Sequence, residues 1–140
     1  STASFNTYAS QIVTNAQTLA GALTSKGYQL VTGGTDNHLL LIDLTNKNIP
    51  GAVSETALSK AGITVNKNTV PFDQRSPFDP SGIRLGTPAL TTRGMKEAQM
   101  VQVADWIDQA LESYSNESAL EAIHAQVKEF CQSFPLPIDI

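Results

Sequence analysis

Hydrophobic residues recur at three- and four-residue steps through the first 25 positions of the chain. The side chains in this pattern are Phe5, Tyr8, Ile12, Ala16, Leu19 and Leu23. Such spacing puts them on one face of an α-helix, and Lys26 followed by Gly27 is typical of a helix end. The pattern therefore predicts a long amphipathic helix whose wide apolar face needs a partner surface.

Shorter apolar runs follow, and they predict strands. The runs cover residues 28–31, 38–44, 63–65 and 83–85. In the second run, residues 39–42 are continuously apolar, which is typical of a strand buried on both faces. Between the second and third runs, Pro50 suits the first turn of a helix that continues to about Lys60 and that Gly62 closes.

Two further amphipathic helices are predicted in the C-terminal third. Their apolar faces comprise Met100, Val103, Ala104, Ile107 and Leu111 in the first, and Leu120, Ile123, Val127, Phe130 and Phe134 in the second. Ser118 and Glu121 have capping-box spacing near the start of the second helix, and Pro135 and Pro137 end it. Together with the strands, this order predicts an α+β fold in which helices cover a small, mostly antiparallel sheet.

Composition and charge exclude several classes of function. The length of 140 residues suits one domain, and the net charge of −4 is scattered without the basic stripe of a nucleic-acid-binding protein. No apolar run reaches the roughly 20 residues that a membrane span needs, and no signal peptide is visible. The lone Cys131 cannot form an internal disulfide, which fits a reducing compartment. We therefore expect a cytoplasmic protein that binds neither nucleic acid nor membrane.

The stretch from Ser81 to Gly94 carries the strongest candidate for binding chemistry. Arg84 stands between two apolar residues of a short strand, and the glycines on either side leave room for close approach to the backbone. A guanidinium in a partly dry site needs an anion, and its planar fork suits a carboxylate. The partner is either the carboxylate of a small substrate or a structural carboxylate such as Asp43 or Asp79.

A long polar loop over residues 66–81 is a second candidate. It contains Pro71, Pro77 and Pro80, and a loop of this length in a compact domain is more often functional than idle. Asn66-Lys67-Asn68 at its start is either a simple turn or a group of amides that hydrogen-bond a ligand, since an amide both donates and accepts.

Other polar residues favour structural roles. His38, near Asp36, is interpreted as a hydrogen-bonding group at the start of a buried strand, because the only other histidine is the distant His124 and no metal-ligand spacing results. Arg93 is expected to bind backbone carbonyls, and Cys131 is expected in the core. Gly33-Gly34 lacks the pattern of a phosphate-binding loop.

Three segments, in the same order as in the family, resemble serine hydroxymethyltransferase, the pyridoxal-phosphate enzyme that interconverts serine and glycine with tetrahydrofolate. They are Gly33-Gly-Thr-Asp-Asn-His38, Gly62-Ile-Thr-Val-Asn-Lys-Asn-Thr-Val-Pro71 and the stretch from Ser81 to Gly94. The resemblance covers nearly the whole chain. It implies the fold of the C-terminal domain of that enzyme, with residues 1–27 as the helix leading in from a large domain and residues 28–140 as the small domain.

The resemblance also implies roles for particular residues. Arg84 would hold the carboxylate of the amino-acid substrate, and Asn68 would hydrogen-bond the folate. Ser76, Pro77 and Phe78 would lie against the folate, where an aromatic face and a rigid proline form one wall. The complete enzyme would be at least a homodimer.

The chain lacks the family's threonine- and histidine-rich motif that carries the Schiff-base lysine. Its lysines, in other contexts, are Lys26, Lys47, Lys60, Lys67, Lys96 and Lys128. Pyridoxal-phosphate chemistry needs such a lysine, and the phosphate-binding and acid–base residues of the family also belong to the large domain. We therefore expect a C-terminal part of the enzyme, inactive alone, whose partner is the N-terminal domain that binds most of the cofactor.

Two alternatives come from other classes of protein. One is a non-catalytic binding module that keeps this fold and a preformed anion site. The other is the small domain of a different pyridoxal-phosphate enzyme, such as an aminotransferase, which also uses an arginine for a carboxylate. The Asn66-Lys67-Asn68 and Ser76-Pro77-Phe78 segments favour the folate enzyme.

Overall fold

The structure is a computed structural model that describes residues 2–31 and 39–135. Its elements are α1 (Thr2–Ser25), β1 (Gln29–Leu30), β2 (Leu39–Asp43), the 3-10 turn η1 (Thr45–Lys47), α2 (Gly51–Lys60), β3 (Asn66–Asn68), β4 (Gly82–Gly86), α3 (Pro88–Thr92), α4 (Glu97–Glu112) and α5 (Glu117–Gln132). Within the described ranges, no helix combines the length and the apolarity of a membrane span.

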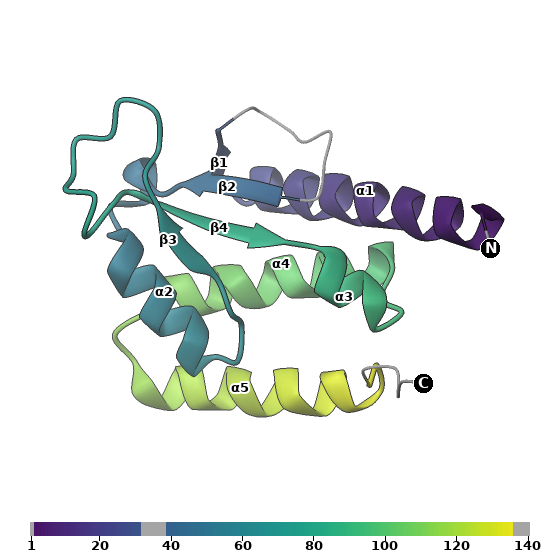
Figure 1. Cartoon of the computed structure of the whole chain (residues 1–140). Helices are drawn as coiled ribbons and strands as arrows, with labels where there is room; N and C mark the ends of the chain where they lie inside the picture. The colour runs from purple at the N-terminus through teal and green to yellow at the C-terminus, as the bar shows by residue number, and fades with distance from the viewer. Residues whose placement is uncertain (1, 32–38, 136–140) are drawn as a thin grey trace.

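The strands of the described residues form one antiparallel sheet in the order β1-β2-β4-β3. Helices α1 and α2 pack against the sheet, α4 packs against both of them, and α5 packs against α2 and α4. Figure 1 shows α4 and α5 side by side below the sheet, and the long loop between β3 and β4 projecting from the upper left. The predicted α+β architecture is confirmed.

The helices of the described residues cover one face of the sheet. Leu40 and Ile42 of β2 are 2% and 0% exposed and belong to the core, whereas Leu39 is 45% exposed. Successive side chains of a strand point to opposite faces, so the continuous apolar run does not produce a strand buried on both sides. The prediction of full burial for β2 is wrong, and the opposite face of the sheet, called here the open face, keeps apolar side chains without cover from these helices.

The first helix follows its prediction closely. Leu19 and Leu23 are fully buried, and Ala16 and Ala20 lie beside them. Toward the N-terminus the face emerges from the core, and Tyr8 is 38% exposed with its hydroxyl 2.7 Å from Thr92 Oγ1. The apolar face thus finds its partner surface mainly on α4.

The third predicted strand is displaced. Residues 63–65 form no strand, and the pairing with β4 begins at Asn66 instead. Gly62 has φ of 87°, and the Ile63 amide donates to Leu58 O, so the residues after α2 complete its C-terminal turn. The Asn66-Lys67-Asn68 segment, expected to be a loop or turn, is therefore strand β3.

The helix at the C-terminus begins differently from its prediction. Asn116 is the N-cap of α5, and its side-chain oxygen accepts a hydrogen bond from the Ala119 amide at 3.1 Å. Ser118 lies inside the helix, so the predicted capping box is wrong. Trp106 of α4, which the periodicity did not include, is 6% exposed and meets Phe130 edge to face with ring centroids 4.9 Å apart.

Candidate functional site

Arg84 lies at the middle of β4 and projects from the open face of the sheet. Ile83 and Leu85 on either side are buried in the core, while Arg84 itself is exposed. The expectation that these neighbours surround the guanidinium with apolar groups is wrong, because adjacent residues of a strand point to opposite faces. Within this chain the guanidinium is therefore open to an anion from outside.

The structural carboxylates considered as partners of Arg84 bind other groups. Asp43 Oδ1 accepts from the Thr45 amide at 2.9 Å and from Thr45 Oγ1 at 2.6 Å. Asp79 accepts from Arg75 Nη2 at 2.6 Å and from the Ala52 amide at 3.1 Å. Over residues 2–31 and 39–135, no acidic side chain forms an ion pair with Arg84. The interpretation of Arg84 as half of an internal pair with Asp43 or Asp79 is wrong.

The sheet register determines the neighbours of Arg84. Leu41 of β2 and Asn66 of β3 are its directly paired residues, and directly paired residues project from the same face. Asn68 is paired with Gly82, two residues from Arg84, so its side chain is on that face as well, at a diagonal position. Diagonal neighbours are roughly 7–8 Å apart, which brings the predicted carboxylate-binding and folate-binding residues together. Asn66, which belongs to the same predicted group of ligand-binding amides, is directly paired with Arg84.

Gly82 permits this close arrangement of three strands. A Cβ atom there would lie 2.7 Å from Val70 Cγ1, 2.8 Å from Asn68 O and 3.0 Å from Ile42 O. Two of these atoms are backbone and cannot move aside without breaking the ladder. Gly82 therefore serves the packing of the sheet, and not the approach of a ligand that its sequence context predicts.

Asn68 has an amide that is only partly used within the chain. Its Nδ2 donates to Thr69 O at 2.8 Å, and its side chain is half-buried. No hydrogen bond to its side-chain oxygen is formed by the described part of the chain. An acceptor on the open face beside Arg84 thus remains for a ligand.

Ser76, Pro77 and Phe78 lie in the loop between β3 and β4, and all three are exposed. Ser76 Oγ accepts from the Phe78 amide at 3.1 Å, which closes a local turn. Among the described residues, no hydrogen bond or ion pair joins this tripeptide to Arg84 or Asn68. The structure therefore groups Arg84 with Asn68 and places the tripeptide on the neighbouring loop.

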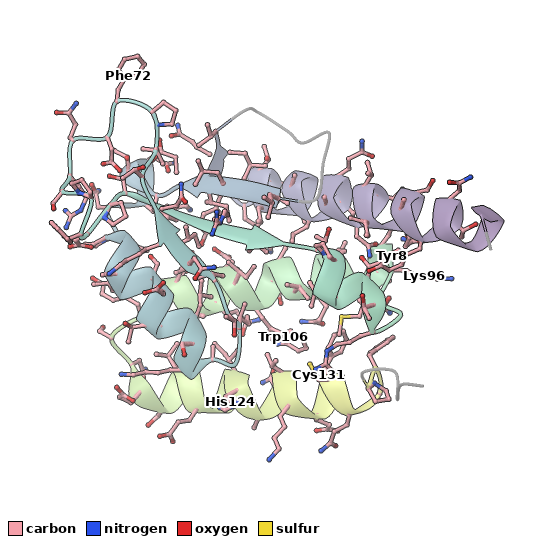
Figure 2. All side chains as sticks on the ribbon, viewed as in Figure 1. Tyr8, Phe72, Lys96, Trp106, His124 and Cys131 are labelled. Carbon is pink, nitrogen blue, oxygen red and sulfur yellow. The ribbon has the colours of Figure 1, made fainter. Side chains whose placement is uncertain are left out.

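Two aromatic rings of this loop are largely exposed. Phe78 is 87% and Phe72 94% exposed, and Figure 2 shows Phe72 at the tip of the loop, pointing away from the sheet and the helices. Burial of these side chains therefore contributes little to holding the loop in place.

The loop between β3 and β4 is held in place by hydrogen bonds to two carboxylates, those of Asp73 and Asp79. Asp73 Oδ2 accepts from the amides of Val70 at 3.2 Å and Ser81 at 2.9 Å, and Oδ1 accepts from the Arg75 amide at 2.9 Å and Ser81 Oγ at 2.6 Å. Burial alone would raise the pKa of Asp73, but the bonds from Ser81, Arg75 and Val70 outweigh it and hold that pKa well below its ordinary value. Sequence reasoning missed Asp73, since an aspartate among polar loop residues carries no distinguishing pattern.

Asp79 holds the other end of the loop. The hydrogen bond from Arg75 and then that from the Ala52 amide lower the pKa of its carboxyl group. Because Ala52 is in the first turn of α2, Asp79 joins the loop to the N-terminus of a helix, where a negative charge is favourable.

Among the described residues, the others singled out in the sequence contribute nothing to this site. His38, Asp36, Gly33 and Gly34 lie outside the described residues. His124 is exposed on α5 (Figure 2), and the residues searched contain no cluster of metal ligands. Arg93 Nη1 donates to Phe134 O at 3.0 Å, which confirms its structural role, and Cys131 is half-buried against the core.

Comparison with known proteins gives a consistent answer. The family model of serine hydroxymethyltransferase matches residues 1–107. The serine hydroxymethyltransferase of Acidobacterium capsulatum is 60% identical over 132 residues, which are 94% of this chain and 31% of that protein. The serine hydroxymethyltransferase of Sorangium cellulosum is 53% identical over 133 residues, or 95% of this chain and 31% of that protein. The chain thus spans about a third of the length of these relatives.

Proposed function

Because this chain belongs to the serine hydroxymethyltransferase family, we propose that it supplies the substrate-carboxylate arginine and part of the folate site of such an enzyme. The reaction is the interconversion of serine and glycine with tetrahydrofolate. The observation that carries the proposal is the position of Arg84, exposed on the open face with Asn68 diagonal to it.

Arg84 binds the carboxylate of serine or glycine through two parallel hydrogen bonds. The guanidinium fork matches a carboxylate, and charge-assisted bonds of this kind are roughly twice as strong as neutral ones. When the rest of the enzyme covers the open face, the lower dielectric strengthens the pair further. A carboxylate held at two points fixes the orientation of the substrate, and orientation can lower a reaction barrier by several kcal/mol.

Asn68 and the tripeptide Ser76-Pro77-Phe78 form the folate side of the site, called here the folate wall. The amide oxygen of Asn68 accepts from the polar edge of the pterin ring. Phe78, whose ring is 87% exposed in this chain, gains apolar contact when it lies against the ligand. Pro77 keeps this segment stiff.

Catalytic groups come from the rest of the polypeptide. Pyridoxal phosphate supplies an electron sink for carbanion chemistry at the substrate Cα when it is bound. The chain lacks the family's motif around the Schiff-base lysine, so its own residues bind and orient the substrates while the N-terminal domain holds the cofactor. We therefore propose that these 140 residues are inactive alone and that the complete enzyme is a cytoplasmic homodimer or a higher oligomer.

Binding of glycine to the complete holoenzyme tests the role of Arg84. Replacing Arg84 with Ala removes both hydrogen bonds and the charge, and we expect the Kd for glycine to rise at least about 100-fold. Arg84→Lys keeps the charge without the fork, so a rise of about tenfold is expected. Isothermal titration of each variant measures these constants.

Lys128→Ala is the matched control, because this lysine is an exposed cation on α5. Its glycine affinity should equal that of the wild type. A Kd for Arg84→Ala within twofold of the wild-type value would show that the substrate carboxylate binds elsewhere.

A further inference from the structure

The loop between β3 and β4 is closed by one carboxylate group. Asp73 accepts hydrogen bonds from Val70 at the start of the loop, from Arg75 in its middle and from Ser81 at its end. The fourth bond, from Ser81 Oγ, is 2.6 Å long. The chain from 70 to 81 therefore forms a ring around Asp73, and Ser81 is the residue that directly precedes β4.

The folate wall is held within this ring. Arg75 donates its amide to Asp73 and its guanidinium to Asp79, and these residues lie on either side of the tripeptide. Inside that span, the Phe78 amide donates to Ser76 Oγ and the Asp79 amide to Ser76 O at 2.9 Å. The conformation of Ser76-Pro77-Phe78 thus depends on polar bonds that begin at Asp73.

Apolar burial does not replace those bonds. Phe72 and Phe78 are almost fully exposed, and the buried apolar residues of the loop are Val70, at 7% exposure, and Pro80. A loop with few buried apolar contacts has low local stability, so its position relative to the sheet follows from its hydrogen bonds. An ionised carboxylate accepting several of them forms the strongest anchor available.

The second anchor of the loop does not reach β4. Asp79 joins the loop to the first turn of α2 through the Ala52 amide. Asp73 binds both the amide and the hydroxyl of Ser81, which directly precedes β4 and is three residues before Arg84 in the chain. Asp73 therefore links the folate wall to the strand that carries the carboxylate-binding arginine.

We propose that Asp73 is a positioning residue for the folate cosubstrate. Asp73 holds Ser76-Pro77-Phe78 at a fixed position relative to Arg84 and touches neither substrate. This inference rests on the proposed function. It predicts that loss of the Asp73 hydrogen bonds weakens tetrahydrofolate binding selectively, because β4 is still held by its ladders to β2 and β3.

The test uses the complete holoenzyme and its Asp73→Asn and Ser81→Ala variants. Two constants are measured for each, the Kd for glycine alone and the Kd for tetrahydrofolate in the presence of saturating glycine. For Asp73→Asn we expect the tetrahydrofolate Kd to rise about tenfold or more and the glycine Kd to stay within about twofold. Ser81→Ala leaves the carboxylate in place and removes its shortest bond, so a smaller rise in the tetrahydrofolate Kd is expected.

Asp108→Asn is the matched control. It makes the same isosteric change at a carboxylate of α4, which accepts a 2.8 Å hydrogen bond from Tyr28 Oη, and both Kd values should equal those of the wild type. Hydrogen exchange of the Val70, Arg75 and Ser81 amides should speed up in Asp73→Asn and stay unchanged in the control.

Three results would overturn the inference. The first is an unchanged tetrahydrofolate Kd in both loop variants of an enzyme whose wild type binds folate, which leaves the proposed function intact. The second is an equal rise of both Kd values, which indicates a general structural role for Asp73. The third is a wild-type enzyme that binds glycine but no tetrahydrofolate, which contradicts the proposed function itself.

Discussion

Phe72 has a left-handed backbone conformation, with φ of 58°, and a side chain that is 94% exposed. For a residue with a bulky side chain this conformation costs roughly 1–2 kcal/mol, because Cβ approaches the following carbonyl oxygen. At this exposure, burial of the side chain offsets little of that cost. Asp73, the next residue, directs its carboxylate into the loop.

Replacing Phe72 with Asn should stabilise the chain by about 0.5–1 kcal/mol, since asparagine adopts the left-handed region more readily. Urea denaturation of the 140-residue chain measures the change in the free energy of unfolding. Phe78→Asn is the control, because Phe78 is an equally exposed aromatic of the same loop whose φ is not positive. An equal gain in both variants would mean that loss of exposed apolar surface, and not relief of strain, is responsible.

Single residues also show where sequence reasoning succeeds. Arg84 is conspicuous in the sequence, because it is a charged residue inside an apolar strand segment. The prediction that Ile83 and Leu85 surround its guanidinium is wrong, because adjacent residues of a strand project from opposite faces. Asp73 is inconspicuous in the sequence. Its importance comes from four hydrogen bonds, donated by Val70, Arg75 and Ser81, and no local sequence pattern indicates them.

At the scale of elements, the helices were predicted best. A 3.6-residue period over 16 to 24 residues is a strong signal, and α1, α4 and α5 all appear where it indicates. Strands of two to five residues carry too few positions for a period, so β3 was misplaced by three residues, and the five-residue α3 was not predicted. Caps were missed for a similar reason, since Asn116 and Ser118 both suit an N-cap and tertiary packing selects between them.

Asn15 joins α1 to the segment after β4. It is fully buried, and its Nδ2 donates to Thr91 Oγ1 at 2.8 Å and to Met95 O at 2.9 Å, while Gln11 donates to its Oδ1 at 2.9 Å. A buried amide of this kind is stabilising only while all its partners are present.

Asn15→Ala should lower the free energy of unfolding by about 2–4 kcal/mol, because it leaves a cavity and the buried Met95 carbonyl without this donor. Thermal and urea denaturation of the chain provide the measurement. Gln17→Ala changes an exposed polar residue of the same helix and should have an effect below about 0.5 kcal/mol. A loss of similar size in both variants would contradict a specific role for Asn15.

At the scale of the whole molecule, the two faces of the sheet have different roles. The helices cover one face and form the core, while the open face presents Arg84, Asn68 and the apolar Leu39. The relatives are about three times as long as this chain. We expect the additional polypeptide to cover the open face and complete the site there.

Acid should destabilise the chain through its loop carboxylates. The pKa of Asp73 and that of Asp79 are lower in the folded chain than the roughly 3.9 of an unfolded aspartate. As the pH falls below about 4, the unfolded chain takes up these protons first, so the stabilisation present above that pH is progressively lost. Urea denaturation between pH 7 and pH 2.5 should show a steeper loss in the wild type than in Asp73→Asn. Parallel curves would contradict the contribution of Asp73.

Reconstitution of activity tests the central claim most directly. The chain is mixed with a separately made N-terminal portion that carries the Schiff-base lysine, and cleavage of serine is assayed with tetrahydrofolate. We predict no activity from either part alone, activity from the mixture, and loss of at least about 99% of it with Arg84→Ala. Full activity of the Arg84→Ala mixture, or an inactive mixture of two folded and associated parts, would contradict the account.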